Sequence, residues 1–564
     1  MRKTKIIATL GPACSDSKIL QKMFKIGLSA VRINTAHISP GDVKRSRRRV
    51  DSINALEGTH VGLIVDLKGP ELRTGEFRGG TFTVSKGKRY KLSSNSKGSD
   101  ISLNNESVFR MIKENDVVLM SDGMVQFKTI QCDGSSAVVL AGNSGTLRDR
   151  SRVNIPGRIL DLGTVTNRDK LFIEEGIKAG AEFFALSFVQ SRSNVLELQK
   201  MVLESGGNSE IVSKIETKSG LQNIKEIVRS SAFVMVARGD LGVELPLEEV
   251  SLAQKKIIFE SHNEGVPTIV ATQILESMVY NTSPTRAEVS DVTNAIMDNV
   301  DALMLSEETA IGKNPIEAVK YLTEISEYVD SRALKFLEPR SFYGNKVAFS
   351  ISMASKVVAT EIDADGILVF TKSGNTARMI SQMRPQVPIY ATVTNENLAN
   401  KLNLLRGVIP IILPTKFSKS NDLLSAIEYF NSINFFSRKA RLVVVSGAPY
   451  FLFGGTNDVR IVTMGKFLGR GYPSGKSVEG RITNEIGGKG EILIVNSDGS
   501  DFKVPKRKFK AVIFTNGISI EIREILIDSG TTVLTNTSLI TNLKEGHAVS
   551  IDGETGVITG QTYL

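Results

Sequence analysis

Charged and polar side chains stand where several short apolar runs of the sequence end. Lys214 and Glu216 close one run, and Asp240 closes the next run along the chain. If these runs are neighbouring parallel strands, their C-terminal ends meet at one rim and the three side chains lie together. Two carboxylates on adjacent strands are hard oxygen ligands that can share a Mg2+ or Mn2+, while water and substrate fill its other positions. A lysine beside them adds a positive charge, so the three residues together favour phosphoryl-transfer chemistry.

Each of these residues also has a purely structural interpretation. Lys214 and Glu216 are consistent with a salt bridge at a strand end, and Asp is a favoured N-cap residue for a helix. Scattered surface charge, however, would not select run ends repeatedly, and polar residues do recur there. They are Arg32 and Asn34, Asp66 and Lys68, Arg238 and Gly239, Thr272 and Gln273, and Ser306 and Glu308.

The runs themselves predict the elements that position these side chains. They are short, rich in β-branched residues and mostly followed by a helical pattern. Eight such runs alternating with helices are typical of a parallel (β/α)8 barrel, or TIM barrel, in which chemistry sits at the C-terminal strand ends. The runs are Lys5–Gly11, Ala30–Thr35, Val61–Lys68, Phe183–Val189, Glu210–Glu216, Phe233–Asp240, Thr268–Gln273 and Ala302–Glu308.

Three other segments do not follow the barrel repeat. Residues 75–160 hold short strand-like pieces with many Gly, Ser and Asn, which predicts a small β-barrel lid domain inserted into a βα loop. A second α/β series begins near residue 335, and a glycine-rich, strand-rich tail begins near residue 470. We therefore expect a discontinuous catalytic TIM barrel (1–74 and 161–334), the lid (75–160), an α/β regulatory domain (335–469) and an extra C-terminal domain (470–564).

The composition indicates a globular protein with several cores. The chain has 564 residues, 41% hydrophobic and 23% charged, and one core does not usually support that length. No apolar run has signal-peptide or transmembrane length, and Cys14 and Cys132 show no pairing pattern, so we expect a cytoplasmic protein. The net charge of +10 includes a basic run from Lys44 to Arg49. Few aromatic residues accompany it, so we interpret it as a solvated helix face and expect neither nucleic acid nor membrane as a partner.

Several longer motifs resemble those of the pyruvate kinase family, in order and across residues 1–470. Arg32-Ile33-Asn34 with His37 resembles the family's Arg-Leu-Asn-Phe-Ser-His, and Asp66–Gly75 is similar to its Asp-Thr-Lys-Gly-Pro-Glu-Ile-Arg-Thr-Gly. The resemblance implies transfer of the phosphoryl group of phosphoenolpyruvate to ADP, giving pyruvate and ATP in the last step of glycolysis. Further stretches that resemble family signatures are Thr4–Ala13, Met235–Glu244, Ala271–Met278, Pro284–Glu288 and Leu305–Ala310.

The resemblance also implies roles at the substrate end of the site. Lys214 would stabilise the transferring phosphoryl group, and Arg32 would clamp it. Glu216 and Asp240 would hold the Mg2+ or Mn2+ that bridges the phosphate and carboxylate of the substrate. The backbone N–H groups of Gly239 and Asp240, at a helix start, would receive the substrate carboxylate.

The same resemblance implies which residues face the nucleotide and which lie where the last proton is delivered. Asn34, His37 and Arg73 would face the nucleotide. Thr272 and Ser306 would lie beside the enolate, where a water relay delivers the proton to carbon; for Ser306, a hydrogen bond to nearby backbone is the alternative. The lid would close over metal and nucleotide and exclude water.

Regulation and assembly follow from the resemblance as well. The stretch 371–376, Thr-Lys-Ser-Gly-Asn-Thr, is similar to the family's effector loop, although a plain turn would use the same residues. Its small residues leave backbone N–H groups free to bind the phosphate of an allosteric effector. The family also implies a homotetramer. The residues expected to bind the effector are Thr371, Ser373, Gly374, Asn375 and Thr376.

Two departures from the family concern a monovalent ion. Ala36 and Leu67 replace a Ser and a Thr that supply oxygens to the activating K+ of potassium-dependent members. Only Asn34 and Asp66 remain of the four ligands, so we expect little dependence on K+. Glu71, however, is the residue that potassium-dependent members carry at its position.

Two further departures lie elsewhere in the site. Glu307 replaces the family's Gly next to Ser306, and Ser151-Arg152 stands where the lid usually shows Lys-Gly. The second change bears on how the lid contacts ATP.

The end of the tail, Gly546–Gly556, resembles the end of the swivelling phosphohistidine domain of phosphoenolpyruvate-utilising enzymes. The stretch where that family places Thr-Ser-His is Thr515–Glu521, and it contains no histidine. His547 lies later, near a strand start. We therefore expect a domain that kept this fold without the phosphoryl-carrier chemistry.

Two other functions remain to be weighed. A catalytically silent protein could keep the pocket to sense phosphoenolpyruvate or a sugar phosphate, but Lys214, Glu216, Asp240 and Thr272 are all present. A phosphoenolpyruvate-using dikinase would need a nucleotide-grasp domain, for which the chain has no room.

Overall fold

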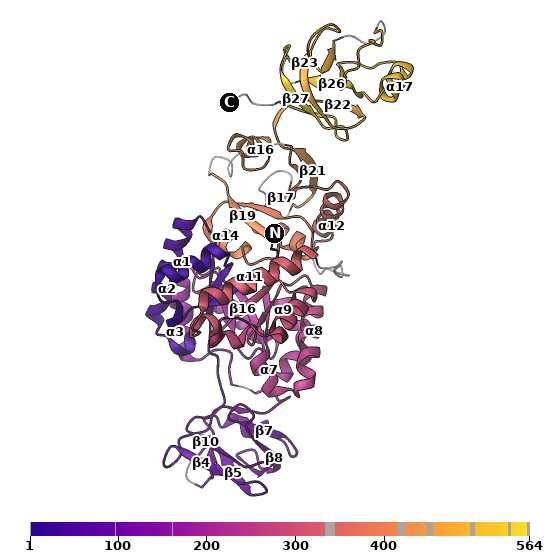
Figure 1. Cartoon of the computed structure of the whole chain (residues 1–564). Coiled ribbons are helices and arrows are strands. Elements are labelled where there is room, and N and C mark those ends of the chain that lie inside the picture. The colour runs from indigo at the N-terminus through magenta and orange to yellow at the C-terminus, as the bar shows by residue number, and fades with distance from the viewer. Residues whose placement is uncertain are drawn as a thin grey trace. The chain divides into compact units, whose positions relative to one another are not determined.

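The computed structural model describes residues 2–95, 98–160, 162–332, 345–414, 423–437, 439–447, 455–496, 502–539 and 543–560. It divides into two compact units, Met1–Met353 with Thr371–Ile412, and Ala354–Phe370 with Leu413–Leu564. The first unit contains the catalytic barrel, the lid and part of the α/β region. The second contains the rest of that region and the tail (Figure 1).

The eight predicted runs form a closed parallel barrel, so the predicted TIM barrel is confirmed. The strands follow in the order β1, β2, β3, β12, β13, β14, β15 and β16, and β16 pairs with β1. The register sets Asn34 beside Asp66, which brings the polar strand ends to one rim. The strands are β1 (Lys5–Thr9), β2 (Ala30–Asn34), β3 (Gly62–Asp66), β12 (Phe183–Leu186), β13 (Glu210–Ile215), β14 (Phe233–Ala237), β15 (Thr268–Ala271) and β16 (Ala302–Leu305).

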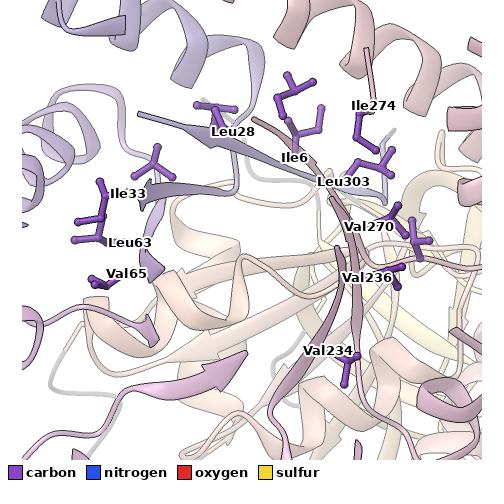
Figure 2. Packing of buried hydrophobic residues seen from close by; sticks show 14 of the residues in the cluster. Ile6, Leu28, Ile33, Leu63, Val65, Val234, Val236, Val270, Ile274 and Leu303 are labelled. Atoms are coloured by element: carbon purple, nitrogen blue, oxygen red, sulfur yellow. The ribbon is translucent and has the colours of Figure 1, made fainter. Parts of the chain in front are cut away.

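A ring of helices covers the outside of the barrel and buries one continuous apolar layer. Val236, Val270 and Leu303 of neighbouring strands lie in this layer (Figure 2), together with Phe24 from the first helix. Burial of a side chain of this size stabilises the fold by about 1.5–3 kcal/mol. The helices are α1 (Ser17–Ile26), α2 (Pro40–Glu57), α3 (Asn167–Lys178), α4 (Arg192–Glu204), α5 (Lys218–Gln222), α6 (Ile224–Ser230), α7 (Arg238–Glu244), α8 (Leu247–Asn263), α9 (Arg286–Met297), α10 (Glu307–Ala310) and α11 (Pro315–Arg332).

Two buried ion pairs lie near the N-terminal ends of the barrel strands. Arg384 Nη1 donates to Asp301 Oδ1 at 2.7 Å and Nη2 donates to Oδ2 at 3.0 Å. Asp301 Oδ2 also accepts the Thr268 N–H at 2.9 Å, so the pair connects to the starts of β15 and β16. Arg406 donates to Asp330 Oδ1 at 2.5 Å, and the side chains of both pairs are at most 3% exposed.

The inserted segment is a small β domain, as predicted. It holds a two-stranded sheet of β4 and β10 and a six-stranded sheet in the order β11, β7, β8, β9, β5, β6. Both sheets share one apolar core that includes Val84, Tyr90 and Phe127. The strands are β4 (Thr81–Val84), β5 (Arg89–Ser93), β6 (Ile101–Ser102), β7 (Val117–Met120), β8 (Val125–Cys132), β9 (Ser136–Ala141), β10 (Gly145–Arg148) and β11 (Val153–Asn154).

The region predicted as a second α/β series does contain alternating strands and helices. In the first unit, β18 (Ile389–Val393) pairs in parallel with β19 (Val408–Ile412), accompanied by α13 (Asn375–Gln382) and α14 (Glu396–Leu402). In the second unit, β17 runs parallel to β20, and β20 pairs antiparallel with β21. The remaining elements are β17 (Gly366–Phe370), β20 (Arg441–Ser446), β21 (Asp458–Thr463), α12 (Lys346–Glu361) and α16 (Leu423–Ser432).

The tail forms a second closed barrel, in the strand order β22, β26, β25, β24, β23, β27, β28. Thr515–Glu521 leads from β25 to the start of α17, where the Ser519 hydroxyl caps the helix. His547 is exposed just before β27, and its Nδ1 accepts the Lys544 N–H at 3.2 Å. No helix in the described parts of the chain could span a membrane. The elements are β22 (Lys466–Ser474), β23 (Val478–Thr483), β24 (Ile492–Val495), β25 (Ala511–Phe514), α17 (Ile520–Asp528), β26 (Thr532–Leu539), β27 (Ala548–Ile551) and β28 (Val557–Gly560).

Candidate active site

Lys214 is the centre of a buried polar cluster at the C-terminal rim of the barrel. Its Nζ lies 2.9 Å from Glu216 Oε1 and 3.2 Å from Asp66 Oδ1, and it donates to the Ser187 hydroxyl at 2.8 Å. The lysine side chain is only 12% exposed. The ends of β3, β12 and β13 thus meet around one ammonium group. The end of β2 joins the cluster because Arg32 also binds Asp66.

The protonation of this cluster is set by opposing effects. Burial would lower the pKa of Lys214, but the carboxylates of Asp66 and Glu216 outweigh burial and raise it above its ordinary value. Burial raises the pKa of Glu216 in spite of Lys214 beside it. The ammonium group is therefore charged at neutral pH, which is the state that phosphoryl chemistry requires.

Glu216 and Asp240 are the candidate ligands of a divalent ion. Glu216 Oε2 accepts the Phe188 N–H at 2.8 Å, which fixes the carboxylate at the end of β13. Burial would raise the pKa of Asp240, but Arg152 and Lys214 hold it below its ordinary value. Asp240 is thus an anionic hard oxygen donor in the first turn of α7, directly after the strand next to β13, and this donor set fits Mg2+ or Mn2+.

Two carboxylates are too few to bind such an ion tightly by themselves. Among the described residues no group of three or more His, Cys, Asp or Glu side chains could hold a metal. Substrate oxygens and water would therefore complete the coordination, as is usual where an ion works on a phosphate.

Arg32, on β2, binds the same carboxylate of Asp66 as Lys214 does. Its Nε donates to Asp66 Oδ2 at 2.6 Å and its Nη1 donates to the Thr9 hydroxyl at 3.2 Å. Asn34 is at the end of the same strand, and its Oδ1 accepts the Ala36 N–H at 3.1 Å. Both oxygens of Asp66 therefore face protein cations, Arg32 and Lys214.

Thr272 occupies a strained turn after β15. Its φ is +65° and that of Gln273 is +54°, values that β-branched residues rarely adopt. Arg238 holds the turn by donating to the Thr272 carbonyl at 2.8 Å and to the Gln273 carbonyl at 2.6 Å. The Thr272 hydroxyl accepts the Gly239 N–H at 2.9 Å, so this predicted carboxylate-binding N–H already has a partner.

Ser306 follows β16 with a buried hydroxyl. Its Oγ has no hydrogen-bond partner among the described residues, so the backbone bond considered as its alternative is not formed there. Its backbone N–H donates to Glu308 Oε2 at 2.7 Å, and Glu308 also accepts the Leu275 N–H at 3.0 Å. Glu308 thus fixes the loop, and the Ser306 hydroxyl stays free for another group.

Arg73 and His37, two of the residues expected at the nucleotide, lie outside this cluster. Arg73 binds Glu71 at 2.7 Å and donates to the Arg150 carbonyl at 2.7 Å, at the entrance to the lid. His37 is exposed just after β2. A cleft lies beside the site and is lined by the lid base and barrel loops, including Arg152 and Phe188.

The predicted effector loop is a turn at the start of α13. The Gly374 N–H donates to the Thr371 hydroxyl at 2.9 Å, and the φ of Gly374 is +86°, which favours glycine. Asn375 and Thr376 begin the helix.

The sequence analysis did not assign a role in the site to three of its residues. Ser187 follows β12 and could have been found by the same strand-end rule, because it is polar after an apolar run. Arg238 was noted as a polar residue at a strand end, but its hydrogen bonds to the Thr272 turn have no local signal in the sequence. Arg152 was noted as a departure, but its contact with Asp240 joins residues 88 positions apart.

A family model described as the pyruvate kinase barrel domain matches residues 1–319, and one described as the pyruvate kinase alpha/beta domain matches residues 350–462. The chain belongs to the pyruvate kinase family. The expected pyruvate kinase activity is thereby confirmed, and the protein is an enzyme, a phosphotransferase.

Known pyruvate kinases resemble the chain over most or all of its length. A pyruvate kinase of Thermoplasma acidophilum is 50% identical over 556 residues, which cover 99% of this chain and 98% of that protein. A pyruvate kinase of Sporosarcina psychrophila is 34% identical, with 99% of both chains covered. The crystal structure of the pyruvate kinase from Pyrobaculum aerophilum superimposes with a TM-score of 0.73 at 29% identity, covering 82% of this chain and 99% of that one. The first two similarities extend over the C-terminal tail.

Proposed function

We propose that Lys214 is the cation that stabilises the phosphoryl group while this enzyme transfers it from phosphoenolpyruvate to ADP. The observation that carries this proposal is the buried ammonium of Lys214 on β13, 2.9 Å from Glu216 Oε1. A phosphoryl group in transfer spreads negative charge over its oxygens, and a fixed buried cation is most effective there. Arg32 would bind the same group from the other side.

Glu216 and Asp240 would hold the divalent ion, Mg2+ or Mn2+. When bound, such an ion neutralises charge on the phosphate and carboxylate of the substrate. Glu216 is kept in place by the Phe188 N–H, so it is positioned before substrate arrives. Gly239 and Asp240 would receive the substrate carboxylate, provided that the Thr272 hydroxyl releases the Gly239 N–H.

The enolate left after transfer needs a proton on carbon. Thr272 and Ser306 would line that side of the site and orient a water relay. The unpartnered Ser306 hydroxyl supports this role, because a buried hydroxyl without a partner is costly unless a ligand or water satisfies it. Asn34, His37 and Arg73 would contact the nucleotide, and the lid would exclude water from the reaction.

A coupled assay of pyruvate formation tests the function. We expect pyruvate from phosphoenolpyruvate and ADP when Mg2+ or Mn2+ is present, and no turnover after chelation by EDTA. Restoring the ion should restore the rate. A chain that binds phosphoenolpyruvate but forms no pyruvate under any of these conditions would be the silent binding protein instead.

We expect the activity to change little when K+ is replaced by a bulky organic cation. Ala36 and Leu67 offer no side-chain oxygen, Asp66 is bound by Arg32 and Lys214, and the Asn34 oxygen is bound by a backbone N–H. Few oxygens remain to replace the water shell of K+. The measurement is the rate at constant ionic strength in K+ and in tetramethylammonium. Strong activation by K+ would show that backbone or water oxygens complete a site.

The remaining assignments belong to the same proposal. The enzyme would be a cytoplasmic homotetramer with the four domains predicted from the sequence, and Thr371, Ser373, Gly374, Asn375 and Thr376 would bind a phosphorylated effector. The tail would serve assembly rather than phosphoryl transfer, because Thr515–Glu521 carries no histidine and the exposed His547 binds backbone.

A further inference from the structure

Arg152 of the lid reaches into the rim of the barrel and binds Asp240. Its Nη1 donates to Asp240 Oδ1 in a charge-assisted hydrogen bond. The guanidinium also lies over the ring of Phe188, with its central carbon 4.8 Å from the ring centroid. The arginine side chain is 15% exposed. This contact is therefore a largely buried ion pair between the lid and a candidate metal ligand.

The backbone of Arg152 is fixed at the point where the chain leaves the lid. Its carbonyl accepts the Ser121 N–H at 3.0 Å, and the next N–H, of Val153, donates to the Leu72 carbonyl at 2.8 Å. Arg152 itself bridges to Arg73, on the segment that enters the lid. The backbone of Arg152 thus forms part of the lid base, while its side chain binds Asp240 on the barrel.

The charges around the guanidinium explain why it faces the site. Asp240 acts on it most strongly, followed by the carboxylates of Glu216 and Glu71, and together they raise the pKa of Arg152 in spite of burial. Its Nη2 is buried and has no hydrogen-bond partner among the described residues. Asp240 is therefore the partner that holds the guanidinium, and Nη2 has no acceptor among the described residues.

We propose that Arg152 is a positioning residue that competes with the divalent ion for Asp240. This inference rests on the proposed role of Asp240 as a metal ligand. A guanidinium bound to Asp240 Oδ1 neutralises that carboxylate and repels a divalent ion at its other lone pairs, so each cation weakens the binding of the other. Binding of the ion and the contact of Arg152 with Asp240 then oppose each other by the same factor.

The competition has a consequence for the order of events. With an ion on Asp240, Arg152 would leave that carboxylate, and the lid base around the Ser121 and Val153 amides would be held less tightly. The lid is thus held by Arg152 before the ion binds and is released by the same ion that the reaction uses.

Binding of Mn2+ alone, followed by electron paramagnetic resonance on the full chain without substrates, tests the proposal. We compare the parent with Arg152→Gln and with Arg150→Gln, a matched loss of charge at an arginine whose side chain is 72% exposed and pairs with Glu76. We expect Arg152→Gln to bind Mn2+ about tenfold more tightly. The Arg150→Gln control should match the parent. Equal or weaker binding by Arg152→Gln overturns the proposal.

Amide hydrogen exchange gives a readout that a merely structural role would not move. In the parent, saturating Mn2+ should speed exchange of the Ser121 and Val153 amides, and in Arg152→Gln exchange should be insensitive to Mn2+. Exchange in the parent that does not respond to Mn2+ contradicts the coupling.

An Asp240→Asn variant separates this inference from the proposed function. Mn2+ binding that is equal in the parent and in Asp240→Asn would remove Asp240 as a ligand, and the proposed function and the competition would both fail. Binding that requires Asp240 but is unchanged in Arg152→Gln would overturn the competition alone.

Discussion

Lys214→Met should lower the turnover number by at least about a hundredfold, the loss typical when a fixed electrostatic stabiliser is removed from an active site. The methionine side chain has similar length but no charge to place against the phosphoryl oxygens. Because the interaction develops mainly in the transition state, we expect binding of phosphoenolpyruvate and Mn2+ to change much less than the rate. The coupled assay gives the rate, and separate titrations give the two affinities.

Lys218→Met is a suitable control for this variant. Lys218 lies four residues away at the start of α5 and is exposed, so the loss of its charge should leave the rate near that of the parent. Turnover by Lys214→Met within a few-fold of the parent would reject the role given to Lys214. A variant that lost Mn2+ binding together with the rate would instead assign Lys214 to the organisation of the metal site.

Asp301→Asn should lower the free energy of unfolding of the first unit by about 3–5 kcal/mol, the usual cost of breaking a buried ion pair on one side. Asp301 is fully buried, and its two oxygens accept from Arg384 and from the Thr268 N–H. An asparagine presents an amide N–H2 to the guanidinium and leaves a buried cation without its counter-charge. Chemical denaturation followed by circular dichroism measures the loss.

Two variants and a pH series make this test specific. Asp298→Asn removes the partner of the half-exposed Lys255 and should cost less than about 1 kcal/mol. Combining Asp301→Asn with Arg384→Met should be less destabilising than Asp301→Asn alone, since no buried charge then remains unpaired. If Asp301→Asn loses no more stability than Asp298→Asn, the buried pair is not a major contributor.

The sign of the pH dependence follows from the carboxyl. Burial would raise the pKa of Asp301, but Arg384 holds it below its ordinary value of 3.8. The pair therefore contributes its full stability above pH 3.8 and loses it as the pH falls below that value. The gap between Asp301→Asn and the parent should close in acid.

The barrel and most of its rim could be predicted because the signals are local. Each buried strand is a short apolar run, and the barrel geometry sends the residue after each run to one rim. Lys214, Glu216 and Asp66 meet there for that reason. The β-rich lid and the two later series of strands were predictable from the same periodicity.

Other features depend on contacts between distant residues, for which one sequence carries no pattern. The pair of Arg384 and Asp301 joins residues 83 positions apart, and the contact of Arg152 with Asp240 crosses from one β domain to the barrel. The positive φ of Thr272 could not be foreseen either, because neither Thr272 nor Gln273 is a residue type that favours it. These conformations are imposed by packing rather than by local preference.

The turn at Thr272 has a consequence for the energetics of each reaction cycle. Backbone in this region is costly by about 1–3 kcal/mol for each such residue, and it persists only because the surroundings over-determine it. Arg238 and the barrel supply that constraint when the chain folds. The backbone of Thr272 is therefore already in place when substrate enters, and phosphoenolpyruvate has to displace only the hydrogen bond between the Thr272 hydroxyl and the Gly239 N–H at this corner of the site. The conformation of this turn is thus fixed once, during folding, and is present in every turnover.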